Sequence, residues 1–373
     1  MNPLLLFKKK YYPLNTIEIS SKALLANYYH LSRLSKNVMV APSVKSNGYG
    51  HGIQIVAKIL DNVGAPFFCV DSLYEAYELQ KAKIQTPILI MGYTDVRNLK
   101  NQQLPFSFAV YSKEQVLALS KYQQEAKIHI FVDTGMHREG INISDLQAFL
   151  KFIKQLKNIQ VDGVMSHLGA GDNLLASKRQ IDIFNKAKKI ILDASFRPKW
   201  LHIAASSGLL HSSDYKKDIG NLARVGIALY GIEPERIDDN LQPILTFKTT
   251  LNQIKRLKKG EKVGYDFTFT AKKDMTIGVL PVGYFDGVDR RLSNIGSVFI
   301  KGTKCPILGR VSMNITMIDI SKAQTPQVGD NVIIFSNKSG DENSIVNAAS
   351  IANTIPYDLA VRLSSTTKRV VVE

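Results

Sequence analysis

The sequence predicts an α/β protein in which an N-terminal (β/α)8 barrel is followed by a C-terminal β domain. Eight short apolar runs occupy the first two thirds of the chain, and segments with helical periodicity separate most of them. Apolar strands that alternate with helices are typical of a parallel sheet covered on both faces. Eight such units within about 220 residues favour a closed barrel over the alternative, a doubly wound sheet. The expected strands span residues 38–44, 67–70, 88–92, 106–111, 128–133, 161–167, 200–205 and 222–230.

The helices between these strands are expected from apolar residues that recur at positions i, i+3, i+4 and i+7. Ser144 is the expected N-cap of its helix, because Gln147 follows it at the third position. The expected helices include 53–60, 73–81, 113–120, 144–156 and 181–194.

The pattern changes after about residue 240, where apolar runs come with glycine turns and little helix. This predicts a separate β domain, and we place the two domains at residues 1–240 and 241–373. The segment 16–19 precedes the first helix, so pairing with the β domain instead of the barrel stays open. The β domain is expected to contain strands 246–254, 275–281, 297–300, 310–318, 331–335 and 369–372, and a helix at 344–352.

Composition restricts the class of protein. Of the 373 residues, 45% are hydrophobic and 21% charged, which argues against disorder, collagen and coiled coil. The net charge of +16 comes from 48 basic and 32 acidic residues, but the lysines are spread along the chain as on solvated faces. We therefore expect no nucleic-acid partner, although such a surface would attract small anions.

Targeting signals and cysteines point to a cytoplasmic protein. No apolar run approaches the roughly 20 residues needed to cross a bilayer, so we expect no membrane partner. The opening MNPLLLFKKKYY is a poor signal peptide, because its lysines follow a short apolar stretch instead of preceding it. Cys69 and Cys305 stand alone without metal-ligand spacing, so neither a disulfide framework nor a metal site is expected.

Polar side chains lie within, at the end of or just after five of the eight predicted strands, and catalytic groups of a barrel lie at the carboxyl ends of its strands. They are Lys45, Arg138, His167, Ser206 with Ser207, and Arg224. Lys45 precedes a loop rich in glycine, and a partly desolvated lysine in the mouth of a barrel suits a Schiff base. The alternative is a lysine at the rim whose amine reaches into water.

The loops after the seventh and eighth strands are the usual phosphate site of this fold. Ser206 and Ser207 offer hydroxyls there, and Gly226 lets backbone N–H groups approach an anion closely. A lysine that faces a phosphate site implies pyridoxal 5'-phosphate. Without that lysine, the serines are ordinary loop hydroxyls.

These residues lie in motifs that resemble the alanine racemase family of fold-type III pyridoxal-phosphate enzymes. The motifs occur in family order as VKSNGYGHG, VDTGM-R-G, R-GIALYG, VGY--T-TA, GY-DG and GRVSM, and cover nearly the whole chain. The resemblance implies a TIM barrel with a C-terminal β domain, and an isomerase that interconverts L- and D-alanine. It also implies a cytoplasmic homodimer with shared active sites that supplies D-alanine for peptidoglycan.

The resemblance also assigns roles to individual residues. Lys45 would bind the cofactor and act as a base on one face of the substrate Cα, and Tyr265 of the other subunit would act on the opposite face. Arg138 would hold the substrate carboxylate and supply positive charge near Tyr265. Arg224 would face the pyridine nitrogen, and His167 would hold Arg224 by a hydrogen bond. Further roles are implied for Tyr49, Ser206, Gly226 and Ile227 at the phosphate, Met313 at the substrate carboxylate and Tyr284 on the access path.

Several positions depart from the family pattern. Phe131 stands where the family usually has a lysine, often carbamylated, that orients the arginine. Arg138 must then be held otherwise, by the neighbouring His137 or by a bound anion. Glu139 adds a charge, and Ser365 stands where some members have a tyrosine, so the pocket could be larger.

Four other functions stay open at this point. A racemase of the same fold could act on serine or lysine. A fold-type III decarboxylase shares the barrel-plus-β plan, but the motifs VGY--T-TA and R-GIALYG do not fit it. A non-catalytic pyridoxal-phosphate carrier shares the barrel and the lysine, but lacks the β domain and Tyr265. A degenerate racemase could do mainly structural work.

Overall fold

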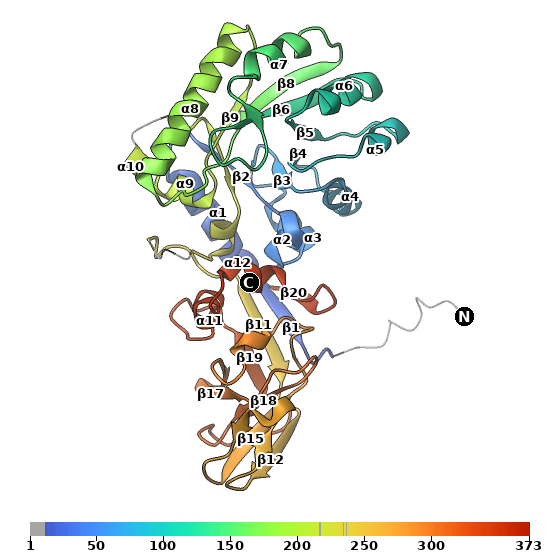
Figure 1. The fold of residues 1–373 in the computed structure, drawn as a ribbon. Coiled ribbons are helices and arrows are strands. Elements are labelled where there is room, and N and C mark those ends of the chain that lie inside the picture. Colours follow the sequence, from blue (N-terminus) through green and yellow to red (C-terminus); the bar gives the residue numbers. More distant parts are fainter. Residues whose placement is uncertain (1–11, 216–217, 234, 236) are drawn as a thin grey trace, which may run out of the picture. The chain divides into compact units, whose positions relative to one another are not determined.

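The computed structural model describes residues 12–215, 218–233, 235 and 237–373 (Figure 1). These residues form two compact units, one of Leu24–Leu241 and one that joins residues up to Ala23 with Gln242–Glu373. The segment 1–11, which contains most of the poor signal-peptide candidate, lies outside the described residues. No helix within the described part of the chain is both long and apolar enough to cross a membrane.

The first unit contains all eight predicted barrel strands in a parallel arrangement. A parallel ladder joins β3 to β9 in chain order, and β10 pairs with β2. Val44 N donates to Cys69 O across β2 and β3, and Arg224 N donates to Ala204 O after β9. These bonds close the ring, which confirms the barrel over the doubly wound sheet. The strands are β2 (Met39–Pro42), β3 (Phe68–Val70), β4 (Ile88–Ile90), β5 (Ser107–Val110), β6 (Ala126–Asp133), β8 (Ile159–Met165), β9 (Trp200–His202) and β10 (Leu222–Val225); the short β7 (Ile141–Asn142) pairs with β6.

Helices alternate with these strands, as Figure 1 shows. Two of them begin where a serine caps the first turn: Ser72 Oγ accepts from Glu75 N, and Ser112 Oγ accepts from Gln115 N. The helices are α1 (Ser21–Arg33), α2 (Lys45–Tyr49), α3 (Ile53–Leu60), α4 (Leu73–Lys81), α5 (Val96–Asn101), α6 (Lys113–Tyr122), α7 (Leu146–Ile153), α8 (Leu174–Asp193), α9 (Ser206–Leu210) and α10 (Ser212–Tyr215).

The predicted N-cap at Ser144 is wrong. Helix α7 begins two residues later, its N-cap residue is Asp145, and no side chain caps it by a hydrogen bond. Asp145 N instead donates to Asn142 O, so Ser144 lies within a backbone turn that precedes the helix.

The second unit is built on a nine-stranded sheet with the order β12-β15-β18-β17-β16-β19-β11-β1-β20. Strand β1 pairs antiparallel with β11 and parallel with β20, so the opening strand belongs to this sheet. The strands are β1 (Thr16–Ser20), β11 (Leu245–Thr250), β12 (Gln253–Leu257), β15 (Met275–Leu280), β16 (Ser297–Ile300), β17 (Thr303–Leu308), β18 (Thr316–Asp319), β19 (Asn331–Phe335) and β20 (Lys368–Val372). A separate hairpin pairs β13 (Lys262–Val263) with β14 (Phe269–Thr270), and the helices are α11 (Ile345–Ile351) and α12 (Pro356–Val361).

Two expected strands of this unit need correction, and the elements that were not expected include β13, β14, β17 and α12. The predicted strand 246–254 is two strands, β11 and β12. Of the predicted strand 310–318, only the end belongs to β18, because Ser312 N donates to Ile315 O and makes a turn before it. Helix α12 was not expected, and it begins at Pro356, whose missing N–H has no partner to lose at a first helical position.

Candidate active site

The first unit gathers the predicted barrel residues at the carboxyl ends of its strands. Lys45 begins α2 after β2, and Arg138 follows β6. His167 follows β8, Ser206 begins α9 after β9, and Arg224 lies within β10. Because parallel strands end at one side of a barrel, these five residues share one rim.

Lys45 lies beside a carboxylate that the sequence analysis did not identify. Its Nζ donates to Asp71 Oδ1 over 3.0 Å, and Asp71 directly follows β3. Glu75 joins the two loops, since its carboxylate accepts from Asn47 N at 3.2 Å and from Asp71 N at 2.8 Å. The available signal was positional: Asp71, like Lys45, is a charged residue immediately after a buried strand.

Arg224 is buried and uses its terminal N–H groups on four acceptors of the barrel. Nη1 donates to His202 Nδ1 at 2.7 Å and to His202 O at 3.1 Å. Nη2 donates to Ser166 O at 2.7 Å and to His167 Nδ1 at 3.2 Å. These contacts leave Nε–H, for which the described residues provide no hydrogen-bond acceptor. Burial lowers the pKa of Arg224 to about 10. This value is still well above 7, so the guanidinium stays protonated and acts only as a donor at neutral pH.

The histidines around Arg224 are neutral. Burial, with the nearby charge of Arg224, lowers the pKa of His167 to about 3, and the same two causes lower the pKa of His202 well below its usual range. The contact of His167 with Arg224 was expected from the sequence, whereas His202, the last residue of β9, was not. A histidine at a buried position of a barrel strand was the signal that could have found it.

A small cradle of hydroxyl and amide groups lies at the start of the segment after β10. Ser206 Oγ accepts from Gly226 N at 3.1 Å and from Ala228 N at 3.3 Å. A Cβ on Gly226 would lie 2.3 Å from Tyr49 Oη, so only glycine lets this tyrosine approach the amide. Two hydroxyls close to backbone N–H groups are donors that suit a phosphate. The cradle therefore fits the phosphate of a cofactor that Lys45 would hold.

Arg138 has a different neighbour from the one expected. His137 Nδ1 lies 3.0 Å from Asp133 Oδ2, and the described residues show no contact between His137 and Arg138, so what holds Arg138 stays a prediction. Arg138 Nε instead lies 3.7 Å from Glu139 Oε2, and both side chains are exposed to solvent. Phe131 is buried against Ala109, Met165 and neighbouring side chains.

The second unit brings together the three predicted residues that it contains. Tyr265, Tyr284 and Met313 line one hollow of about 790 Å³. Tyr284 N donates to Ser312 O, and Phe285 N donates to Met313 O, each at 3.0 Å. A Cβ on Gly283 would lie 2.1 Å from Ser312 O, so glycine permits this contact. The segment after β15 and the turn before β18 are thereby held side by side.

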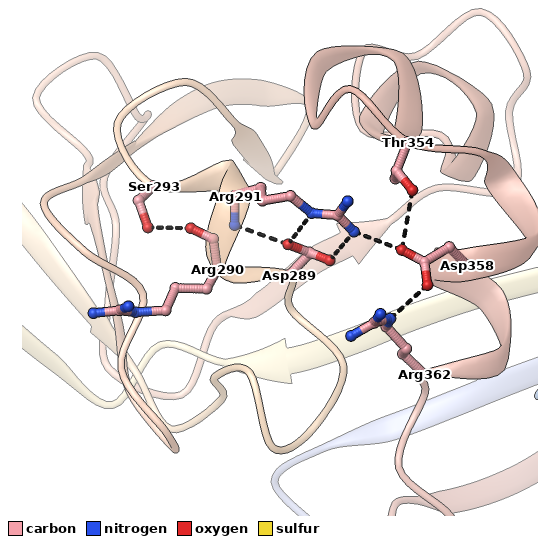
Figure 2. A network of polar contacts seen from close by, with 7 residues as sticks. All are labelled: Asp289, Arg290, Arg291, Ser293, Thr354, Asp358 and Arg362. Carbon is pink, nitrogen blue, oxygen red and sulfur yellow. Dashed lines mark hydrogen bonds and ion pairs between the residues drawn. The ribbon is translucent and has the colours of Figure 1, made fainter.

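Asp289, Arg291 and Arg362, which line this hollow, belong to an ion-pair network. Figure 2 shows the network. Arg291 Nη2 contacts Asp289 Oδ2 at 2.7 Å and Asp358 Oδ2 at 2.6 Å. Arg362 Nε contacts the other oxygen of Asp358 at 2.6 Å. The network joins the 3-10 turn Arg290–Leu292 to α12, while the side chain of Arg290 points away from it (Figure 2).

Two domain descriptions match nearly the whole chain. "Alanine racemase, N-terminal domain" matches residues 19–234, and "Alanine racemase, C-terminal domain" matches residues 244–371. An alanine racemase of Thermodesulfovibrio yellowstonii is 33% identical over 361 residues, which cover 94% of this chain and 96% of that protein. One of Lactobacillus acidophilus is 34% identical over 347 residues, which cover 88% of this chain and 90% of that protein.

Solved structures agree with the sequence relatives. The alanine racemase of Clostridium difficile superposes with a TM-score of 0.89 at 26% identity, covering 98% of this chain and 97% of that one. The alanine racemase of Bacillus anthracis with bound L-Ala-P gives 0.88 at 28% identity, covering 98% and 96%.

Proposed function

Because the chain belongs to the alanine racemase family of isomerases, we propose that it interconverts L-alanine and D-alanine with pyridoxal 5'-phosphate. The observation that carries the proposal is the buried guanidinium of Arg224. Its four terminal N–H groups donate to acceptors of the barrel, whereas its Nε–H donates to none of the described residues. That N–H would face the ring nitrogen of the cofactor. An arginine does not give up its proton, so the ring nitrogen would stay unprotonated.

The cofactor would be held along the barrel rim. Lys45 would hold it covalently, and Tyr49, Ser206 and the backbone N–H groups of Gly226 and Ile227 would hold its phosphate. The donor chemistry of the cradle supports this assignment. When bound, the group withdraws electrons from the substrate Cα and makes its hydrogen acidic.

Stereoinversion needs two proton carriers on opposite faces of Cα. Lys45 Nζ would take or return the proton on one face, and Tyr265 Oη of a second copy of the chain would do so on the other. Arg138 would hold the substrate carboxylate with the backbone N–H of Met313. Its charge near Tyr265 would help the hydroxyl give up a proton. Tyr284 would line the access path.

A homodimer would complete each site. Exposed aromatic side chains in two segments that contribute to the hollow support this: Tyr265, which lines it, is 67% exposed, and Phe267 and Phe285, close in sequence to lining residues, are 64% and 53% exposed. Side chains of this kind grouped on one surface are typical of an interface. A second copy would cover them and carry its Tyr265 and Tyr284 to the barrel rim of the first. We further propose that the enzyme works in the cytoplasm, where its D-alanine would supply peptidoglycan.

The test uses the purified full chain with pyridoxal 5'-phosphate and L-alanine in D2O. Chiral chromatography follows the D-enantiomer, and NMR follows deuterium at Cα. The proposal expects deuterated D-alanine, and none with Lys45→Ala. Cofactor bound through Lys45, but no exchange at Cα of alanine, would contradict it.

One observation favours a second candidate, a racemase with broader substrates. Asp71 places a carboxylate beside Lys45, and a carboxylate at the rim would suit a substrate with a cationic side chain such as lysine. Turnover on alanine, serine and lysine separates the two candidates. This alternative expects lysine turnover to exceed alanine turnover, and Asp71→Ala to lower the lysine-to-alanine ratio of kcat/KM by about tenfold. A ratio that does not change in Asp71→Ala would contradict it.

A further inference from the structure

A chain of polar contacts between side chains runs from Arg224 of β10 through the barrel to β8. His202 Nε2 lies 2.8 Å from His129 Nδ1 of β6. On its other side, His129 Nε2 lies 3.8 Å from Asp162 Oδ2 of β8 and makes no hydrogen bond within the described residues. Both imidazoles are fully buried, whereas the Asp162 side chain reaches the barrel surface. The order is therefore Arg224, His202, His129 and Asp162.

Along this chain of contacts, each hydrogen bond must be donated in the same direction, from Arg224 toward Asp162. A guanidinium only donates, so His202 Nδ1 must be the acceptor of the 2.7 Å contact with Arg224. The proton of His202 then lies on Nε2 and is donated to His129 Nδ1. His129 in turn carries its proton on Nε2, which faces the carboxylate of Asp162. Each imidazole is neutral, in agreement with a pKa of His129 that burial lowers to about 3.

The sequence makes room for this arrangement at Gly163. A Cβ at that position would lie 2.2 Å from His129 Nδ1 and 2.6 Å from its Cε1. Gly163 has an ordinary backbone conformation that any residue could adopt, so space for the imidazole is the reason for glycine. The β6–β8 ladder also shifts register between Ile128 and His129, directly at this imidazole.

We propose that His129, backed by Asp162, is a positioning residue that fixes the proton of His202 on Nε2 and thereby orients Arg224. His129 supplies the acceptor that holds the proton there, so His202 Nδ1 stays able to accept from Arg224. The consequence for the cofactor rests on the proposed function, in which Arg224 faces the cofactor ring. The proton arrangement does not rest on it and is testable in the cofactor-free chain.

The experiment reads the tautomers directly. The full chain contains seven histidines, so 15N-histidine labelling gives a simple spectrum of ring nitrogens. Spectra of the cofactor-free protein at pH 7 are compared for the parent chain, His129→Leu and His129→Asn. Leucine is close to histidine in size but offers no acceptor, whereas asparagine offers an oxygen near the position of Nδ1. Single histidine replacements assign the signals.

The proposal expects neutral imidazoles protonated at Nε2 for His202 and His129 in the parent chain. His129→Leu should move His202 toward the Nδ1–H form and weaken pyridoxal-phosphate binding by about tenfold, because a buried donor loses its acceptor. His129→Asn should restore the His202 signal and hold binding within about threefold. A His202 tautomer and a cofactor affinity that do not change in His129→Leu would overturn the proposal.

A second variant keeps the test decisive if His129→Leu does not fold. Asp162→Ala removes only a side chain near the barrel surface, so the fold should persist. The proposal expects the His129 signal to shift toward a mixture of tautomers in this variant. An unchanged His129 signal would contradict the role of Asp162. If the parent chain shows the expected tautomers but binds no cofactor, the proposed function fails and the proton arrangement stands.

Discussion

His167 accepts a hydrogen bond from Arg224, whose Nη2 lies 3.2 Å from Nδ1 of the imidazole. The proton of His167 therefore lies on Nε2. Together with the buried His202 and His129, His167 makes three histidines that stay neutral near Arg224. Burial lowers the pKa of His167 and of His129 to about 3, and that of His202 well below its usual range. This arrangement determines how the stability of the barrel unit depends on pH.

The free energy of unfolding should fall as the pH drops below 6.5. The unfolded chain protonates these histidines near pH 6.5, whereas in the folded chain His167 and His129 resist protonation until about pH 3. Their contribution is thus complete above pH 6.5 and is lost on acidification, by about 1.4 kcal/mol per pH unit for each histidine. Urea unfolding at pH 7.5, 6.0 and 5.0 measures the slope. His129→Asn should make the slope shallower, and a stability that stays level down to pH 5 would contradict the account.

Gly163→Ala should destabilise the barrel unit by about 2 kcal/mol or more, because the new methyl would overlap the His129 ring. Gly340→Ala is the matched control, since nothing lies within 4 Å of its Cβ position and its φ is not in the left-handed region. Thermal unfolding of both variants gives the comparison. Equal stability of the two would show that the His129 ring does not need this space.

Glu139→Leu should lower the KM for alanine by about twofold to threefold and leave kcat unchanged. Arg138 lies 3.7 Å from this carboxylate, and both side chains are exposed, so the pair is worth only about 0.5 kcal/mol. Removing the carboxylate frees the guanidinium for the substrate. Steady-state kinetics measure both constants, and a higher KM would mean that Glu139 instead holds Arg138 in place.

Mixed dimers test the shared site. Lys45→Ala and Tyr265→Phe chains should each be nearly inactive alone. After mixing and subunit exchange, one site of each heterodimer would combine an intact Lys45 with an intact Tyr265. Activity should return to about a quarter of the parent value, because half of the dimers are mixed and each has one intact site. No recovery despite proven exchange would place both residues in one subunit.

The sequence predicted correctly those helices and strands whose ends are determined by side chains within the element itself. The helices at 53–60 and 73–81 and the strand at 297–300 have the predicted bounds, because apolar periodicity and turn residues define them locally. The turn at Ser312 was missed because its apolar residues mimic a strand, and the cap at Ser144 because a neighbouring turn competes with it.

The residues of the candidate site likewise fall into those that the local sequence predicted and those that only the closed barrel brings together. Lys45, His167 and Arg224 were found because each lies within or just after a strand of the predicted barrel. His202, His129 and Asp71 were missed because their partners come from other strands, and only the closed barrel brings those strands together. The role of Tyr265 remains a prediction, since it depends on a second copy of the chain.

The most direct test of the central claim is hydrogen exchange at Cα catalysed by Tyr265→Phe in D2O. If Lys45 and Tyr265 serve opposite faces, this variant should exchange the Cα hydrogen of one alanine enantiomer with retention of configuration. Racemisation should fall by about a thousandfold, within the range for loss of a general acid or base. Racemisation of both enantiomers at the parent rate would contradict the two-base account.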